Sequence, residues 1–249
     1  MQIRKKARNI IFVALLAIIV ALLCLFTTRS GDTTCRNTEP VIKDSSTAQF
    51  VTKREIMNYL DRCEMNPYGQ SFKNIDLRGI ERKLEKHLFI KEAQCYLSPN
   101  GTVNVEVRQR KPVIRVSNGS AGGFYMDKEG KRFPLSTAYA AYVPIASGEF
   151  DLTEDYVKKN LLDFAVFIDD DKFWRAQIEQ IYVQRNDVIE LIPRVGDQII
   201  ILGTTENYRS KLKKLRTLYE EAFPKVGWSK YSKIDLRYKG QVVCTKRGV

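Results

Sequence analysis

Few residues of this 249-residue chain have the types and spacing that catalysis requires. His87 is the only histidine, and it lies near the end of an expected helix, where a cation interacts favourably with the helix dipole. A histidine that acts as a general base needs a nucleophile within reach, and no local serine or cysteine motif surrounds it. We therefore expect His87 to be a surface residue at a helix end and not a catalytic base.

Three other patterns resemble functional motifs but lack essential parts. The aspartates at 169–171 lack the alternating spacing and the distal glutamate of a calcium-binding EF-hand. The glycines at 122–123 lack the following Lys-Ser/Thr pair and helix of a phosphate-binding loop. Asp127 and Glu129 look like paired carboxylates, but Asp127 and Gly130 suit a turn. We predict no catalytic, cofactor-binding or metal-binding residue, no enzyme activity and no small-molecule substrate.

The strongest single feature is an apolar run at residues 10–26, IIFVALLAIIVALLCLF. Together with two threonines it is long enough to cross nearly all of the roughly 30 Å hydrocarbon core of a bilayer. Four basic residues and no acid precede it, so the positive-inside rule predicts a cytoplasmic tail at 1–9 and export of the rest. A cleaved signal peptide is the alternative, but no small-residue cleavage site follows. We expect a single transmembrane helix at 10–28 and a linker at 29–34.

The formal net charge is +12, which suits nucleic acid, anionic lipid or an acidic protein partner. The basic residues are scattered and do not cluster with aromatic side chains. We therefore expect no nucleic acid, and a solvated basic surface beside an anionic membrane.

The cysteines outside the expected membrane span are Cys35, Cys63, Cys95 and Cys244. Four cysteines in an oxidising compartment can pair in three ways, and their spacings match no zinc site. Cys95 alternates with Ala93 and Leu97, which is typical of a small, inward-facing strand residue. No particular disulfide is predicted.

Residues 35–116 contain the signals of a small α+β domain. A strand at 35–43 is followed by a helix that begins with the capping box of Thr52 and Glu55. Asp76 is placed to cap a second helix, and the alternating strands at 90–97 and 102–108 flank a strong turn. This order predicts a three-stranded sheet that carries two helices.

Residues 117–249 predict a mostly antiparallel β domain with flanking helices. A hairpin is expected near 124–135, a helix after Thr153, a three-strand meander at 178–202, a helix at 207–223 that Pro224 ends, and strands at 233–238 and 241–244. The basic face of the 207–223 helix, which includes Lys211, Lys213, Lys214 and Arg216, is expected to be mostly solvated. The fold class is therefore α+β.

Three stretches of the chain resemble the FtsQ/DivIB cell-division proteins. They are the hairpin FYMDKEGKRFPLS at 124–136, the ending IDLRY at 234–238, and a pattern formed by Ile90, Ala93, Cys95, Gly101, Val103, Val105, Val107, Arg110 and Pro112. Cys95 departs from the pattern, because the family usually has a branched apolar residue there. The resemblance covers the chain from the apolar run to about Cys244.

The resemblance implies a POTRA domain at 35–116 and an FtsQ-type β domain at 117–249. It implies a single-pass protein of the inner membrane with its N-terminus in the cytoplasm and its bulk in the periplasm, at the division septum. Such a scaffold links and regulates septal peptidoglycan synthesis by binding FtsB/DivIC-like and FtsL-like single-span partners, and its POTRA domain serves other divisome proteins. A POTRA-containing export or envelope assembly component is the alternative, although only one POTRA unit is visible.

A strand near the end of the chain can lie at a sheet edge and accept a partner strand. By resemblance, Arg237 matches a basic position that pairs with partner acids, and Tyr238 and Gly240 match contact positions. Strand packing is an equally good explanation of Tyr238, and the family's later aromatic contact has no counterpart near Thr245. The predicted partner-binding residues are Ile234, Leu236, Arg237, Tyr238, Gly240 and Val242.

Overall fold

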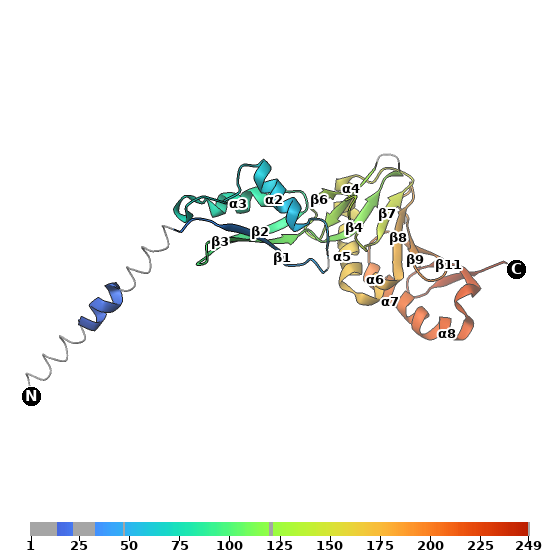
Figure 1. Cartoon of the computed structure of the whole chain (residues 1–249). Helices are drawn as coiled ribbons and strands as arrows, with labels where there is room; N and C mark the ends of the chain where they lie inside the picture. The colour runs from blue at the N-terminus through green and yellow to red at the C-terminus, as the bar shows by residue number, and fades with distance from the viewer. Residues whose placement is uncertain (1–13, 22–32, 47, 120–121, 249) are drawn as a thin grey trace, which may run out of the picture. The chain divides into compact units, whose positions relative to one another are not determined.

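The computed structural model describes residues 14–21, 33–46, 48–119 and 122–248 (Figure 1). The chain divides into two compact units, Met1–Gln109 and Arg110–Val249. We describe each unit by itself.

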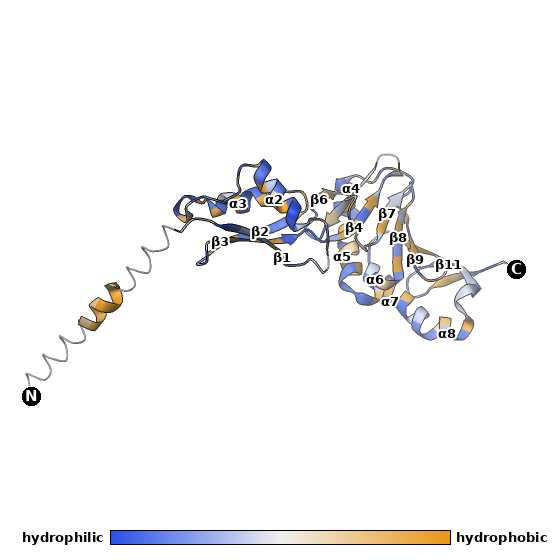
Figure 2. Ribbon diagram, in the orientation of Figure 1, coloured by the Kyte–Doolittle hydropathy of each residue, from blue (hydrophilic) through white to orange (hydrophobic). Residues whose placement is uncertain are grey.

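The predicted transmembrane helix at 10–28 lies mostly outside the described residues. Within it, residues 14–21 are described as a helix with exposed side chains, and Figure 2 shows this helix as strongly hydrophobic. Among the described residues, none of the helices has both the length and the apolar character needed to cross a membrane. The predicted tail at 1–9 and most of the predicted linker at 29–34 also lie outside the described residues.

The first unit contains a three-stranded sheet in the order β1-β3-β2. Strand β1 is parallel to β3, and β3 is antiparallel to β2. The strands and helices are β1 (Asn37–Ile42), α2 (Lys53–Arg62), η1 (Phe72–Asn74), α3 (Leu77–Glu85), β2 (Ile90–Ser98) and β3 (Thr102–Gln109). The predicted small sheet with two helices is confirmed.

The local signals that start the two helices act as predicted. The Thr52 hydroxyl accepts a hydrogen bond from the backbone of Glu55, and the Glu55 carboxylate accepts one from the backbone of Thr52. The Asp76 carboxylate accepts a hydrogen bond from the Gly79 N–H at the start of α3. The buried faces of these helices pack on the buried valines of β3. Cys95 is buried in the same core, as its alternation predicted.

The second unit contains a nine-stranded sheet in the order β12-β11-β10-β9-β8-β7-β4-β5-β6. Three pairs, β4 with β7, β7 with β8, and β10 with β11, are parallel, and the others are antiparallel. The strands are β4 (Pro112–Ser117), β5 (Gly123–Asp127), β6 (Arg132–Pro134), β7 (Ile145–Gly148), β8 (Ile178–Val183), β9 (Ile189–Pro193), β10 (Ile199–Gly203), β11 (Tyr231–Asp235) and β12 (Val243–Lys246). The prediction of a mostly antiparallel β domain is confirmed.

The boundary between the units lies before the predicted one at 116–117. Strand β4 pairs with β5 and β7, so it belongs to the large sheet and not to the first unit. An ion pair of 2.9 Å between Arg110 and the buried Asp127 lies within the second unit. The same Asp127 carboxylate accepts backbone hydrogen bonds from Glu129 and Lys131, which confirms that it belongs to a turn.

Helices of the second unit pack apolar side chains against the sheet. They are α4 (Glu154–Asn160), α5 (Leu162–Asp170), α6 (Lys172–Gln177), α7 (Tyr208–Thr217), the π-helix η3 (Leu218–Ala222), α8 (Phe223–Val226) and η4 (Trp228–Lys230). The prediction that Pro224 ends a helix was wrong. Pro224 lies at the start of α8, where a helix does not need its missing N–H.

Candidate strand-addition edge

Strand β12 is one of the two outer strands of the large sheet. It pairs with β11 in the antiparallel register Lys233↔Thr245, Ile234↔Cys244 and Asp235↔Val243, and with no other strand of the described residues. Most of its residues are exposed. An outer strand of this kind has one row of backbone hydrogen-bonding groups directed away from its sheet.

The backbone contacts of β12 identify which groups face outward. The Arg247 N–H, just beyond the strand, donates a hydrogen bond of 3.0 Å to the carbonyl oxygen of Lys230. Hydrogen-bonding directions alternate along a strand, so the groups of Val243 and Thr245 also face β11. The N–H and C=O groups of Cys244 and Lys246 therefore point away from the sheet.

Lys214 of α7 holds the connection between β11 and β12. Its Nζ donates hydrogen bonds to the carbonyl oxygens of Leu236 at 3.3 Å, Tyr238 at 2.6 Å and Gln241 at 2.9 Å. These three contacts use all three donors of an ammonium group. The expectation that the basic face of this helix is mostly solvated was therefore wrong for Lys214, which fixes the entry of the chain into β12.

Arg237 and Asp235 form a tight pair beside this connection. The Arg237 guanidinium donates from Nη2 to Asp235 at 2.6 Å and from Nε to both carboxylate oxygens at 3.0 and 3.1 Å. The hydrogen bonds from Arg237 hold the pKa of Asp235 below its ordinary value. The Arg237 stem lies against Gly203, whose φ is +78° and where a Cβ would lie 2.9 Å from the Arg237 side chain. A partner carboxylate would have to share Arg237 with Asp235.

A second ion pair holds the far end of β12. Arg247 donates from two nitrogens to the two carboxylate oxygens of Asp197, at 2.6 and 2.5 Å. This bidentate geometry is the most directional form of the arginine–carboxylate contact. Strand β12 is thus held at its start through Lys214 and at its end through Arg247, while its outer edge stays open.

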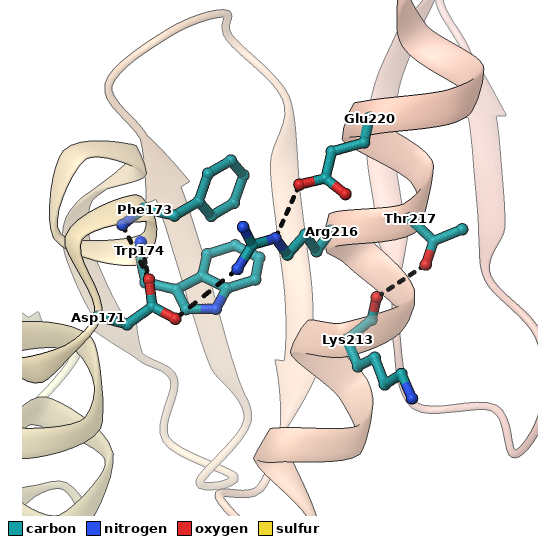
Figure 3. Close-up of polar contacts among 7 residues, drawn as sticks. All are labelled: Asp171, Phe173, Trp174, Lys213, Arg216, Thr217 and Glu220. Atoms are coloured by element: carbon teal, nitrogen blue, oxygen red, sulfur yellow. Dashed lines mark hydrogen bonds and ion pairs between the residues drawn. The ribbon is translucent and has the colours of Figure 1, made fainter.

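Helix α7, which carries Lys214, is itself tied to α6 through Arg216 (Figure 3). The Arg216 guanidinium lies 4.6 Å from the ring centroid of Phe173, 3.9 Å from the Asp171 carboxylate and 2.8 Å from that of Glu220. Asp171 also accepts hydrogen bonds from the first N–H groups of α6. The aspartates at 169–171 therefore include a helix cap, and no group of three possible metal ligands is found among the described residues.

The six predicted partner-binding residues divide into two groups. Ile234, in the inner strand β11, and Leu236, directly after that strand, have 0% exposed surface and lie in the core of the unit. Tyr238 is 47% exposed, and Gly240 has a φ of +77° in the turn before β12. Arg237 is half-exposed in its pair with Asp235, and Val242 is partly buried against the core.

The structure brings Arg237, Tyr238, Gly240 and Val242 together in one connection beside the open edge. The sequence analysis missed Lys214 and the outward-facing positions Cys244 and Lys246. The end of the chain does contain a signal for the edge, since the strand 231–235 is followed by a turn with Gly240 and a second short strand.

The prediction that His87 is a surface residue at a helix end holds only in part. It follows α3, but its ring packs edge-on against Tyr59, with a centroid distance of 4.9 Å. Burial lowers the pKa of His87 below its ordinary value. It is therefore an aromatic packing residue of the first unit.

Comparison with known families agrees with this division of the chain. Residues 33–108 match the family model of a POTRA-like domain, and residues 111–245 match the model described as FtsQ/DivIB, C-terminal related. No curated protein sequence matches the chain. The C-terminal match covers more than half of the chain and ends within β12. The chain belongs to the FtsQ/DivIB-related family, with a POTRA-like domain followed by the C-terminal domain of that family.

Proposed function

We propose that this protein is a bitopic, non-enzymatic scaffold of the bacterial division machinery, which links and regulates septal peptidoglycan synthesis. Family membership supports a division-related scaffold, and the order of a POTRA-like domain and an FtsQ/DivIB-related domain supports it further. In this proposal the protein acts by holding other proteins and not by chemistry of its own.

The proposed location is the inner membrane at the division septum. The apolar run at 10–28 supports a membrane anchor, and the basic tail at 1–9 supports a cytoplasmic N-terminus. Both folded units then lie in the periplasm. The FtsQ/DivIB family match is consistent with this location.

The proposed binding site is the outer edge of β12, and the observation that carries it is the open backbone of Cys244 and Lys246. Backbone hydrogen bonds give such an edge affinity for an extended segment, and neighbouring side chains set the register. Tyr238 is an exposed aromatic side chain in the adjoining connection, and Arg237 offers a positive charge. Because Lys214 and Arg247 hold β12 in place, little ordering of the edge is needed when a partner strand binds.

The proposed partners are FtsB/DivIC-like and FtsL-like single-span division proteins. An FtsB/DivIC-like segment would add to β12, and the FtsL-like protein would be held through it. Other divisome proteins would bind through the POTRA-like domain.

A proline substitution can test the edge directly. Cys244→Pro removes one outward-facing N–H of β12 but none of the hydrogen bonds to β11, and Cys244→Ser keeps that N–H as the matched control. Tagged full-length protein would be purified from detergent-solubilised membranes together with the coexpressed FtsB/DivIC-like and FtsL-like proteins. We expect C244S to retain both partners and C244P to lose them, with tryptophan fluorescence unchanged. Undiminished binding by a folded C244P variant would reject β12 as the docking edge.

A further inference from the structure

The outer edge of β2, in the POTRA-like domain, differs from that of β12. Strand β2 lies at the end of its three-stranded sheet. The Cys95 N–H donates a hydrogen bond of 2.7 Å to Oε1 of Glu81, and the Ala93 N–H donates one of 3.4 Å to Oε1 of Glu85. Both carboxylates come from α3, so the helix covers two successive outward-facing donors of the strand.

The spacing of these groups explains why one helix can cover the edge. Glu81 and Glu85 are four residues apart in α3, about 6 Å along a helix. Ala93 and Cys95 are two residues apart in β2, about 6.8 Å along a strand. The two carboxylates therefore lie at nearly the same repeat as the carbonyl groups of a neighbouring strand. Helix α3 runs opposite to β2, because the earlier residue Glu81 contacts the later strand residue Cys95.

The pKa of the Cys95 thiol is consistent with the same arrangement. Burial and the negative charge of Glu81 raise the pKa of Cys95 to about 12. The side chain itself is buried in the core of the domain. The Glu81 carboxylate therefore accepts a hydrogen bond from the backbone N–H of Cys95 and also lies close enough to raise the pKa of its thiol.

We propose that Glu81 and Glu85 form an edge guard, which closes the β2 edge against strand addition by a second copy of this chain. A second copy is the partner that an uncovered edge meets at high concentration, because an antiparallel strand pair about a two-fold axis uses the same residues from both chains. The guard takes the hydrogen-bonding positions that the second β2 would need. Its carboxylates only accept hydrogen bonds, so they satisfy the N–H groups of β2 and offer no donor to the carbonyl groups of an incoming strand.

The test uses full-length protein in detergent micelles and compares E81A/E85A with E81Q/E85Q. The alanine pair removes the acceptors from β2, whereas the glutamine pair keeps an acceptor oxygen at each position and removes only the charge. Alanine has the highest helix propensity, and glutamine has about the same propensity as glutamate. Neither pair of substitutions should therefore destabilise α3. Sedimentation equilibrium over a 100-fold concentration range measures association, and hydrogen exchange with mass spectrometry measures the amides of Ala93 and Cys95.

We expect E81A/E85A to be monomeric at low concentration, with at least about tenfold faster exchange at Ala93 and Cys95, because each amide loses its acceptor. At high concentration it should become dimeric and regain protection at the same two amides. Wild type and E81Q/E85Q should stay monomeric throughout. An E81A/E85A variant that stays monomeric at every concentration would overturn the proposal, whatever its exchange rates.

The single variants keep the test decisive if the double variant unfolds. E81A removes the shorter hydrogen bond and E85A the longer one, so a guard predicts stronger association for E81A than for E85A. Two single variants that both remain monomeric would reject the guard as well.

Discussion

The two sheets of this protein treat their outer strands in opposite ways. In the POTRA-like domain, α3 extends carboxylates to the outward N–H groups of β2. In the C-terminal domain, α7 extends an ammonium group to carbonyl oxygens of the connection before β12 and leaves the strand edge uncovered. A helix beside a sheet edge can therefore either close the edge or hold it in place, depending on whether its side chain accepts or donates.

The difference lies in a few side chains and not in the class of structure. Both strands are outer and both pair antiparallel with their inner neighbour. Helix side chains reach β2 itself in one sheet and the connection before β12 in the other. Substitutions near the β2 edge and substitutions near the β12 edge should therefore change binding or local stability independently of each other.

The largest change in stability is expected from a substitution in the hydrophobic core of the C-terminal domain. Leu236→Ala removes a fully buried side chain and should lower the free energy of unfolding of the C-terminal domain by about 2–5 kcal/mol. Tyr238→Ala, two residues later and half-exposed, should change it by less than about 0.5 kcal/mol while weakening partner binding. Denaturation followed by tryptophan fluorescence checks both, because Trp174 and Trp228 are the two tryptophans of the chain and both lie in this domain. Equal stability losses would mean that Tyr238 is a packing residue.

A smaller effect is expected when the connection before β12 loses its hydrogen bonds to Lys214. Lys214→Met keeps the aliphatic stem but removes three hydrogen bonds to carbonyl oxygens, so partner affinity should fall by roughly tenfold as the edge becomes less ordered. Lys213→Met is the matched control, since Lys213 is exposed on the same helix. Hydrogen exchange at 243–246 should accelerate only in the Lys214 variant. Equal exchange in both variants would contradict the positioning role of Lys214.

The Arg237–Asp235 pair should make the stability of the C-terminal domain sensitive to acid. Because the pKa of Asp235 is lowered in the folded state, its contribution is complete above the ordinary carboxylate pKa and is lost as the pH falls through the lowered value. We expect this contribution to the free energy of unfolding to be about 1 kcal/mol, because the arginine is half-exposed. Asp235→Asn should remove this part of the pH dependence below about pH 4. Unfolding curves of wild type and D235N that stay parallel from pH 6 to pH 3 would contradict it.

The smallest effect is expected at the far end of β12. The Arg247–Asp197 pair is largely exposed, so Arg247→Ala should lower the free energy of unfolding only slightly, and less at high salt. Local hydrogen exchange at Thr245 and Lys246 is the sensitive measurement. A loss of partner binding as large as that of the Lys214 variant would show that Arg247 is itself a contact residue.

Local features of the fold could be predicted because their signals lie within a few residues of sequence. The capping box of Thr52 and Glu55, the Asp76 cap, the alternating valines of β3 and the turn at Asp127 all follow from neighbours in the chain. The order of the nine strands could not be predicted in this way, because the parallel pairs of β4, β7 and β8 join segments separated by long connections.

Which strand near the end of the chain lies at the sheet edge could not be predicted for the same reason. The alternation of Ile234 and Leu236 is that of a half-buried strand, but β10 and β12 flank β11 on both sides. The role of Lys214 depends on three carbonyl groups more than 20 residues away, and a helical pattern of lysines does not distinguish it from Lys213.

The parallel pairing of β10 with β11 has a kinetic consequence. Strands β8, β9 and β10 form a meander of short connections, whereas β11 can join only after the chain through α7 and α8 has closed back on the sheet. Closing such a loop costs entropy before its contacts form, so we expect β11 and β12 to be the last strands protected in pulse-labelling during refolding. The edge proposed to receive a partner then exists only on a domain that has finished folding, so a partner strand that binds there would select completed molecules.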